Sequence, residues 1–352
     1  MKKMKFIAGI ASLMLAATAL VPVNASAATI TFTQGDVNGD GKVNVNDLYA
    51  ISQYLGGEKT ADSNWTTRMD ADYDKIIDRT DLEMISKFCT QTLTPEKNKS
   101  TTVLTASLNE ERSYMKYDVA SSRISRYTLN SLDTLTNQTT ATYGMERSSV
   151  EIPDDNVLVV KLNGGSGFII GDHLIATAAH CVYNSNGFVA DNISLYDNNN
   201  VEHHLTFSSV HIPKNFYLRD SLALFNEDYA LVTVEEDLSQ YGSMQLGMVT
   251  NEFIQTGSDI SVSGFPGIYG DRRYTTGSVS IDKLEDAEKP YRLRCSADGL
   301  PGKSGGPIYY TENNGSKVVI GIFTHGGKDT DIAAGPRISS TLLQFYYNND
   351  NI

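Results

Sequence analysis

The 352-residue sequence contains three cysteines and one tryptophan, and its basic residues are outnumbered by its acidic ones. With 29 Lys and Arg against 42 Asp and Glu, the formal net charge is −13, which argues against a surface built to bind nucleic acid. Three cysteines are too few for a disulfide framework. Cys181 and Cys295 either pair or both stay free. Because Cys89 makes the total three, at least one cysteine has no intramolecular partner.

Long apolar runs are also scarce, because only the N-terminus has one. Lys2, Lys3 and Lys5 precede an apolar run from Phe6 to about Val23, and Ala25-Ser26-Ala27 forms a cleavage site of small residues. This order is typical of a secretory signal peptide over residues 1–27. No later segment is long and apolar enough to span a bilayer. We therefore expect a secreted, extracellular protein that has no membrane association once the signal peptide is removed.

The sequence does have one stretch that could carry catalysis, residues 298–307, which read Asp-Gly-Leu-Pro-Gly-Lys-Ser-Gly-Gly-Pro. Glycines on both sides of Ser304 let the backbone turn sharply, so that the N–H groups of Gly302 and Ser304 can point at a developing oxyanion. The pattern indicates that Ser304 is a nucleophile, which then needs a general base and a residue to orient that base.

Both partners are found upstream of Ser304. His180 follows Thr177-Ala178-Ala179 at the end of an apolar strand run, and Asp228 stands before the β-branched run Ala230–Val234. Asp220 is an alternative acid, but the run that follows it is less clearly a strand. The order His180, Asp228, Ser304 is that of chymotrypsin and differs from that of subtilisin or the α/β-hydrolases.

The segments T-A-A-H-C, D-Y-A-L-V and G-K-S-G-G-P, with S-V-S-G-F-P-G between the last two, resemble the chymotrypsin-like serine peptidases, and most closely the V8-like (glutamyl endopeptidase) branch. The resemblance covers residues from about 150 to the C-terminus. It implies a mainly β fold with two antiparallel barrels, the first carrying His180 and Asp228 and the second carrying Ser304. Eight short β-rich runs separated by turn residues fit this fold, and residues 339–347 are expected to form a closing helix against the second barrel.

A different pattern occupies the region before the peptidase-like part. Residues 36–47 place oxygen-bearing side chains at the first, third, fifth, ninth and twelfth positions of a twelve-residue loop, with Gly41 at the sixth, as an EF-hand-type calcium loop requires. Residues 70–81 repeat the pattern, except that Lys75 stands at the sixth position and must adopt a positive φ. The predicted ligands of two calcium ions, with a backbone carbonyl at each seventh position, are Asp36, Asn38, Asp40, Lys42, Asn44 and Asp47, and Asp70, Asp72, Asp74, Ile76, Asp78 and Asp81.

Each loop is followed by an amphipathic helical run, and Asp47 and Asp81 replace the usual glutamate at the twelfth position. The pair therefore resembles a type I dockerin, the small calcium-folded α-helical module that docks enzymes onto cohesins of a cellulosome scaffold. On that resemblance Val45, Asn46, Arg79 and Thr80, at the tenth and eleventh positions, face the cohesin. We expect this module to cover residues 28–95.

The composition from Thr90 to about Ser107 turns to Thr, Ser, Lys, Pro and Asn without periodicity, which is typical of a linker. Residues 108–149 are polar and strand-like in patches, so they are either a propeptide or an N-terminal extension packed on the catalytic domain. We therefore assign residues 96–149 to a linker and possible propeptide, and residues 150–352 to the peptidase domain.

We expect this chain to have lost the strict preference of the glutamyl branch for glutamate and to have a broader or altered preference. By resemblance, that branch reads an acidic side chain with a histidine in a G-[IV]-H-T segment and with a threonine upstream, but this chain has Gly321-Ile322-Phe323-Thr324-His325 and has Gly299 in the threonine's place. Asp298, Thr324 and His325 are candidate pocket residues. Asp298 would either favour Lys or Arg from within the pocket or bind backbone N–H groups outside it.

The sequence thus predicts a monomeric serine endopeptidase that acts on protein or peptide substrates without a catalytic cofactor. A catalytically silent binding domain displayed by a dockerin is the alternative, although no triad residue or oxyanion glycine is missing. Lys303 stands where animal trypsin-like enzymes carry an aspartate that receives the new N-terminal ammonium, and a lysine cannot accept that ion. The adjacent His203 and His204 could bind a metal, but a solvated strand edge accounts for them better.

Overall fold

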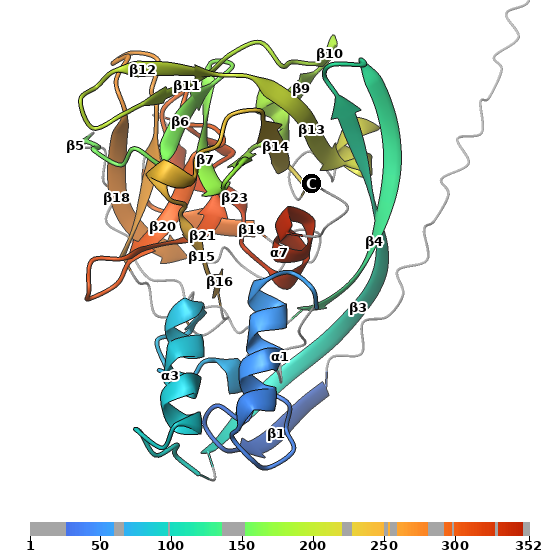
Figure 1. Ribbon diagram of the computed structural model, residues 1–352, viewed down its shortest axis with the longest axis vertical. Helices are drawn as coiled ribbons and strands as arrows, with labels where there is room; N and C mark the ends of the chain where they lie inside the picture. The colour runs from blue at the N-terminus through green and yellow to red at the C-terminus, as the bar shows by residue number, and fades with distance from the viewer. Residues whose placement is uncertain are drawn as a thin grey trace, which may run out of the picture.

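The computed structural model describes residues 26–59, 67–97, 99–135, 152–219, 227–249, 253, 259–280, 292–297, 299–327 and 330–347. Most strands of two large sheets form the upper part of the molecule in Figure 1, and the helices α1 (Val45–Leu55) and α3 (Arg79–Cys89) lie below them, with β1 (Ser26–Phe32) and the lower end of β3 (Lys99–Asp118) beside α1. The expected mainly β fold with a small helical module at its N-terminal side is therefore confirmed.

The first sheet has the strand order β1-β3-β13-β14-β8-β7-β6-β11-β12, with β4 paired to β3. All of its pairs are antiparallel. Its strands are β1 (Ser26–Phe32), β3 (Lys99–Asp118), β4 (Arg123–Leu135), β6 (Val159–Leu162), β7 (Gly165–Gly171), β8 (Leu174–Thr177), β11 (Ile193–Tyr196), β12 (Glu202–Leu205), β13 (Phe207–Pro213) and β14 (Ala230–Val234).

The second sheet has the order β15-β21-β20-β17-β18-β19-β23-β22, with β5 paired to β18. It is antiparallel except for the pair β15 and β21, which is parallel. Its strands are β5 (Ile152–Pro153), β15 (Gln245–Leu246), β17 (Asp259–Gly264), β18 (Arg273–Ser280), β19 (Arg292–Cys295), β20 (Pro307–Thr311), β21 (Lys317–Ile322), β22 (His325–Gly327) and β23 (Thr330–Pro336).

Smaller elements complete the described chain. Two short strand pairs join β9 (Tyr183–Asn184) to β10 (Gly187–Phe188) and β2 (Ile76–Ile77) to β16 (Met248–Val249). The remaining helical turns are η1 (Ala179–Cys181), α4 (Lys214–Tyr217) and η2 (Ser239–Tyr241), and α7 (Ser340–Tyr347) closes the chain. None of the helices in the described ranges has both the length and the apolar character needed to cross a bilayer.

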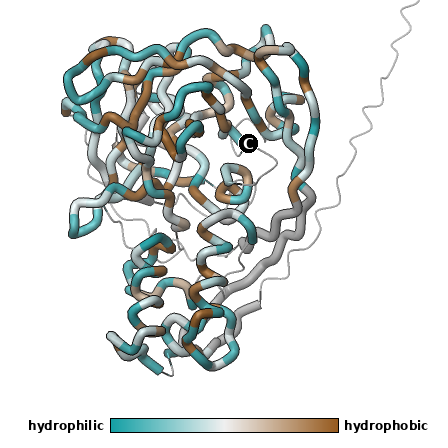
Figure 2. Tube along the Cα trace, viewed as in Figure 1, coloured by the Kyte–Doolittle hydropathy of each residue, from teal (hydrophilic) through white to brown (hydrophobic). Residues whose placement is uncertain are grey.

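Each sheet encloses apolar side chains. Phe168, Ile175 and Leu231 are fully buried in the first sheet, and Val262 and Ile308 are fully buried in the second. Apolar stretches, brown in Figure 2, recur along these strands and along the helices of the N-terminal module. Burial of alternate strand residues is the main force holding such sheets together.

The segment between the module and the peptidase part differs from the expected linker. β3 begins at Lys99 and pairs with β4, and Ser209 to Pro213 of β13 pair with Asp118 to Tyr114 of β3. Residues 99–135 therefore form a long hairpin that joins the first sheet. The sequence hid this because the first half of β3 is rich in Thr and Ser, a composition that is also typical of a linker. Residues 136–149, the rest of the predicted linker and propeptide, lie outside the described residues.

The N-terminal strand β1 overlaps the last two residues of the predicted signal peptide. Ser26 and Ala27, the last two residues of the predicted segment 1–27, begin β1, which pairs with Thr105 to Lys99 of β3. The rest of that segment lies outside the described residues.

The C-terminal helix forms as expected but packs elsewhere. Phe345 stacks on Tyr114 of β3 with ring centroids 4.6 Å apart and meets Tyr229, which precedes β14, edge-on at 5.1 Å. α7 thus packs against the first sheet and the end of α1, and the expectation that it closes the second barrel was wrong. Most residues of this helix are apolar or aromatic, so its sequence pattern could not indicate which neighbouring element it contacts.

Candidate functional site

His180 and Asp228 are brought together by two paired strands. Ala230 of β14 lies opposite Thr177 of β8, so the segment before β14 and the η1 turn after β8 meet at one end of the sheet. Asp228, which is 1% exposed, accepts hydrogen bonds from the backbone N of His180 (2.9 Å) and from its Nδ1 (2.7 Å). With Nδ1–H bound to the carboxylate, the imidazole presents Nε2 as its free acceptor. The alternative acid, Asp220, lies outside the described residues.

The electrostatics of this pair make the imidazolium form of His180 easier to reach than in a free histidine. Burial alone lowers the pKa of His180, but the hydrogen bond and the charge of Asp228, helped by Cys181, outweigh it, so the pKa lies above its ordinary value. The carboxylate therefore both orients the ring and stabilises the imidazolium that would form when the ring takes a proton.

Ser304 lies in a tight turn before β20. Gly302 (φ 102°) and Gly305 (φ 87°) adopt backbone conformations that other residues rarely take, and a Cβ on Gly305 would overlap Ser166 and Thr177. Within the described residues, the N–H groups of Gly302 and Ser304 have no acceptor, whereas the N–H of Lys303 between them donates to Leu300 O (3.1 Å). The two free donors are those that the sequence predicted for an oxyanion.

The Ser304 turn lies directly against the strand end that carries His180. The carbonyl of Ser304 accepts a hydrogen bond from Ser166 N of β7 (2.7 Å), and Cys181 Sγ lies 3.3 Å from the same oxygen. The hydroxyl of Ser304 makes no hydrogen bond to His180 in this structure. Such contacts are often long before a substrate binds, so this geometry does not argue against the pair.

Ser166 is a residue whose role the sequence did not indicate. Its side chain is buried, donates from Oγ to Gly302 O (2.7 Å) and accepts from Phe265 N (2.9 Å). One serine of the first sheet thereby holds the nucleophile turn and a loop of the second sheet in register. A signal was present, because a polar residue between Gly165 and Gly167 inside an apolar strand is unusual, but that signal does not say which backbone groups the serine binds.

Lys303 is fully buried beside the nucleophile. Its Nζ donates to Val262 O (3.4 Å) and to Thr275 Oγ1 (3.3 Å), so the ammonium anchors the turn to β17 and β18. A Cβ on Gly264 would come within 2.7 Å of the Lys303 Cα, which shows how closely the two backbones approach.

The candidate pocket residues lie beside the triad candidates. Thr324 is 5% exposed and donates from its backbone N to Ala334 O (2.9 Å). The half-buried His325 has its ring centroid 6.5 Å from that of His180. Burial, Arg292 and His180 lower the pKa of His325, and Asp228 only partly opposes them, so the pKa of this histidine lies below its ordinary value. Asp298 lies outside the described residues.

Phe323 and Gly299 fit each other where the glutamyl branch carries its two acid-reading residues. Phe323 is 2% exposed, and a Cβ on Gly299 would overlap its ring. The two departures from the branch are therefore one structural change, in which an aromatic ring fills the space that a larger residue at position 299 would take.

Both calcium loops fold in the conformation that the sequence predicts. Gly41 (φ 84°) and Lys75 (φ 75°) at the sixth positions both have positive φ, as expected. Each loop ends in a capping box, in which Asn44 with Asp47 and Asp78 with Asp81 bind each other's backbone N–H groups and start α1 and α3.

The predicted side-chain ligands converge in each loop and are held by loop backbone. In the first loop Asp36 binds Gly41 N, and Asp47 binds Asn38 N and Asn44 N; in the second, Asp70 binds Lys75 N, and Asp81 binds Ala71 N and Asp78 N. Each remaining side-chain ligand accepts a hydrogen bond from the backbone N–H two residues further along the chain. These ligands are Asn38, Asp40, Asn44, Asp72, Asp74 and Asp78.

The donor set suits calcium. Carboxylate oxygens of Asp70, Asp72 and Asp74 lie within 4.8 Å of one another. Asp36 Oδ1 and Asp78 Oδ2 are buried, and neither has a hydrogen-bond partner in the described part of the chain. Burial raises the pKa of Asp74 to about 7 and that of Asp81 well above the ordinary value, with neighbouring carboxylates adding to both. Buried, mutually repelling oxygens of this kind are the hard ligands that a calcium ion would pair.

The four candidate cohesin-facing residues lie in unlike surroundings. Val45 and Asn46 at the start of α1 are exposed, Val45 by 69%. At the start of α3, Arg79 is exposed and bound to Glu83, but Thr80 is half-buried and donates from Oγ1 to Glu312 Oε1 of the peptidase part (3.1 Å).

Two smaller questions from the sequence have structural answers. Cys89, Cys181 and Cys295 are all thiols outside any disulfide, so Cys181 and Cys295 do not pair. His203 and His204 lie on β12 at the edge of the first sheet, where His203 Nε2 binds Asp197 Oδ2 (3.1 Å).

The chain is similar to known proteins in both parts. Residues 165–322 match the family of the trypsin-like peptidase domain, and residues 34–88 match that of the dockerin type I domain. Over 200 residues the chain is 24% identical to the extracellular metalloprotease of Bacillus subtilis (strain 168), a stretch of 53% of this chain. The chain spans 58% of the length of that curated relative.

Solved structures with similarity to this chain include a Glu endopeptidase and the protease Anisep from Arthrobacter nicotinovorans. Each superposes with a TM-score of 0.45, at 18% and 17% identity. The superpositions cover 58% and 56% of this chain and 97% and 98% of those chains.

Proposed function

Because the chain combines a trypsin-like peptidase domain with a dockerin type I domain, we propose that it is a serine endopeptidase docked through a calcium-loaded module to a cohesin-bearing scaffold. One observation carries the serine type. The Asp228 carboxylate holds both the backbone N and Nδ1 of His180, at the strand end that contacts the Ser304 turn.

In the proposed reaction, His180 Nε2 takes the proton of Ser304 as Oγ attacks the scissile carbonyl, and later gives it to the leaving amine. Asp228 keeps Nδ1 protonated and stabilises the charged ring. The N–H groups of Gly302 and Ser304 stabilise the oxyanion, since two donors in a preorganised turn need no rearrangement when charge develops. Water then hydrolyses the acyl-enzyme through the same groups. The reaction needs no cofactor.

The Bacillus relative is named a metalloprotease, so the alternative to a serine peptidase is a metal-dependent one. Inhibitors can distinguish the two types of peptidase. In the described part of the chain, the one cluster of three possible metal-ligating side chains is Asp70, Asp72 and Asp74, in the second calcium loop. We expect phenylmethanesulfonyl fluoride to abolish casein hydrolysis and 1,10-phenanthroline, a transition-metal chelator with little affinity for calcium, to leave it unchanged. The opposite pattern contradicts the serine type.

The alternative function is that of a catalytically silent binding domain, and one substitution tests it. Ser304→Ala removes the nucleophile, and we expect casein hydrolysis to fall by on the order of 10⁶-fold, to background. Cys89→Ala, away from the cleft, is the matched control and should retain full activity. Wild type that hydrolyses neither casein nor denatured peptide pools would show that the domain is silent.

We also propose the compartment and the ion content. The predicted signal peptide over residues 1–27 and the dockerin support secretion to a cell-surface or released scaffold. Each loop supplies a full set of oxygen ligands, which supports two calcium ions, held by residues 36–47 and 70–81. The enzyme acts as a monomer on protein or peptide substrates.

The substrate preference is proposed to be broader than glutamate. Phe323 fills the space beside Gly299, and the pKa of His325 is lowered, so neither supplies a positive charge for an acidic substrate side chain near pH 7. A desolvated acidic side chain without a cationic partner is costly to bind.

A further inference from the structure

The two calcium loops differ at their seventh and eighth positions. The first loop has Lys42, which is exposed, and Val43, which is half-buried. The second loop has Ile76 and Ile77, both 0% exposed. The loops are otherwise alike in conformation, so this difference indicates that the second loop contacts something that the first does not.

What the second loop contacts is the chain's own peptidase part. Ile76 belongs to the apolar cluster of the second sheet together with Val262 and Val318, and a Cβ on Gly247 would come within 2.6 Å of the Ile76 Cγ2. Burying the Ile76 side chain in that cluster removes apolar surface from water and thereby stabilises the contact.

The backbone extends the same contact. β2 pairs antiparallel with β16, with Ile77 opposite Met248 and Ile76 opposite Val249. β16 lies between β15 and β17, two strands of the second sheet, and Figure 1 shows it above the end of α3. The second loop is thus a strand partner of the peptidase domain, whereas no strand pairs with the first loop in the described residues.

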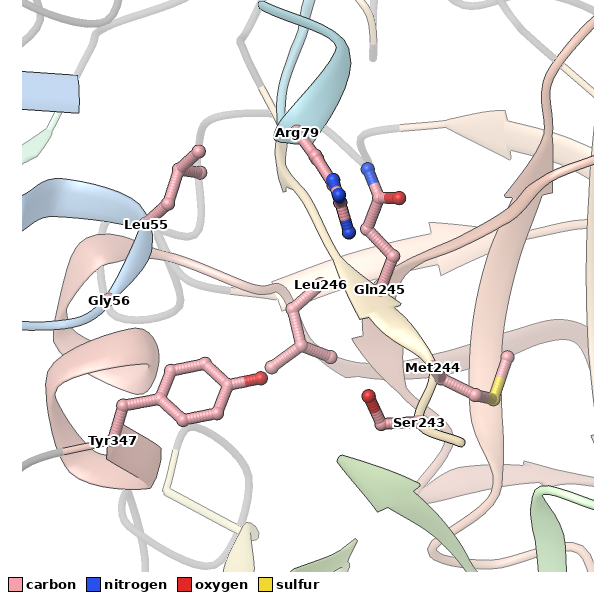
Figure 3. Close-up of a pocket in the computed structure, with 8 residues that line it drawn as sticks. All are labelled: Leu55, Gly56, Arg79, Ser243, Met244, Gln245, Leu246 and Tyr347. Carbon is pink, nitrogen blue, oxygen red and sulfur yellow. The ribbon is translucent and has the colours of Figure 1, made fainter. Parts of the chain in front are cut away.

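The start of α3 lies against the peptidase part at Thr80, whereas the Arg79 side chain is exposed. Thr80 donates to Glu312, and Arg79 overhangs a cavity of about 370 Å³ whose other walls include Leu55, Gln245 and Tyr347. Figure 3 shows the Arg79 and Gln245 side chains alongside each other, with Tyr347 pointing toward the same space from α7. A partner lying on Arg79 and Thr80 would therefore meet the peptidase domain first.

Among the described residues, none of the peptidase part covers the start of α1 in this way. Val45 is 69% exposed and Tyr49, one helical turn later, is 63% exposed, with exposed Asn46 beside them. Adjacent apolar side chains on one helix face, surrounded by polar residues, are typical of a binding surface.

We propose that the module offers one cohesin-binding surface, formed by Val45, Asn46 and Tyr49 on α1, while the equivalent surface on α3 is occupied by the chain's own peptidase domain. The identity of the partner rests on the proposed function, because the dockerin family match implies a cohesin. The allocation of the two surfaces rests on the contacts of Ile76, Ile77 and Thr80.

The test measures binding of the full chain, inactivated by Ser304→Ala, to a panel of type I cohesin modules in calcium by titration calorimetry. Val45→Asp should weaken binding by about thirtyfold or more, as expected at the centre of an interface, and Arg79→Asp at the equivalent position should change it by less than about threefold. Asn46→Ala and Thr80→Ala form a second matched pair, and an unchanged far-UV spectrum checks that each variant is folded. Stoichiometry should be one cohesin per chain. Equal losses at the two positions, or two cohesins per chain, would overturn the proposal.

A panel in which no cohesin binds would count against the cohesin partner in the proposed function, and a second measurement then decides the allocation of surfaces. In a Cys89→Ala background with calcium, Asn46→Cys should react with a maleimide at least about tenfold faster than Thr80→Cys, because thiol reactivity follows exposure. Equal rates would show that the α3 surface is as open as that on α1, which contradicts the proposal.

Discussion

Buried carboxylates in the cleft and in the calcium module have different neighbours. Asp228 is 1% exposed and receives two N–H donors from His180. Asp81 is fully buried too, but its burial raises its pKa, and the nearby Asp70, Asp72 and Asp78 raise it further. The cleft supplies its own counter-charge, whereas the module gathers negative charge that only an added cation can balance.

This contrast teaches that the two regions have different requirements for order. The His180–Asp228 pair is brought together by the pairing of β14 with β8. The loop carboxylates oppose one another until calcium binds. Because Ile76 of the second loop is buried in the apolar cluster of the second sheet, that loop is also tied to the peptidase part.

The largest expected effect comes from removing the counter-charge in the cleft. Asp228→Asn should lower kcat by about 10⁴-fold while leaving the fold intact, because the amide no longer holds the required tautomer of His180. Steady-state kinetics on a peptide substrate measure the fall in kcat. The calcium affinity of the module is the control and should not change. A loss of less than about tenfold would mean that Asp228 does not orient the base.

Calcium removal should be the next largest effect and should act on the module first. With free calcium about a thousandfold above Kd, the ion adds about 4 kcal/mol to module stability. EGTA should therefore lower the thermal midpoint of the module transition in the Ser304→Ala chain, followed by scanning calorimetry, and magnesium should restore it only in part. Unchanged transitions after EGTA would contradict the calcium assignment.

Substrate preference should show a smaller effect. A fluorogenic panel that varies only the residue before the scissile bond should give a Glu preference below about a hundredfold, or about 2.7 kcal/mol. A stronger preference would show that other residues read the acid. The double variant Gly299→Thr with Phe323→His should shift the preference toward Glu, whereas Gly299→Thr alone should destabilise the domain because its Cβ overlaps the Phe323 ring.

The pH dependence follows from the raised pKa of His180. Protonated His180 cannot take the Ser304 proton, so kcat/KM should fall about tenfold per pH unit below that pKa and reach its maximum at alkaline pH. The acidic limb should lie above the ordinary value of 6.5. In Asp228→Asn it should move to lower pH, and a wild-type limb below 6.5 would contradict the effect of Asp228.

Much of the fold could be predicted because its signals are local. The β-rich runs became strands close to their expected bounds, such as Ala230–Val234, and the two loop patterns gave the capping boxes that start α1 and α3. The sixth position of the second loop also took the positive φ that Lys75 required. For the candidate site, the order of His180, Asp228 and Ser304 came from short motifs whose residues lie at strand ends.

What could not be predicted depends on contacts between distant segments. Ser166 holds the nucleophile turn, but nothing near it in the sequence says that Gly302 and Phe265 are its partners. The hairpin of residues 99–135 joins the first sheet through β13, although its composition indicated a linker.

The sequence by itself determined the residue types and the local turns: a serine between glycines, a histidine and an aspartate at strand ends, and oxygen ligands at loop spacing. Only the tertiary structure decided where α7 packs, that Phe323 lies over Gly299, and that Ile76 and Ile77 join the second calcium loop to the peptidase domain. The physical reason is that backbone conformation and capping depend on neighbours within a few residues, whereas burial depends on which distant surfaces meet, and apolar residues such as these isoleucines can be buried against any of them.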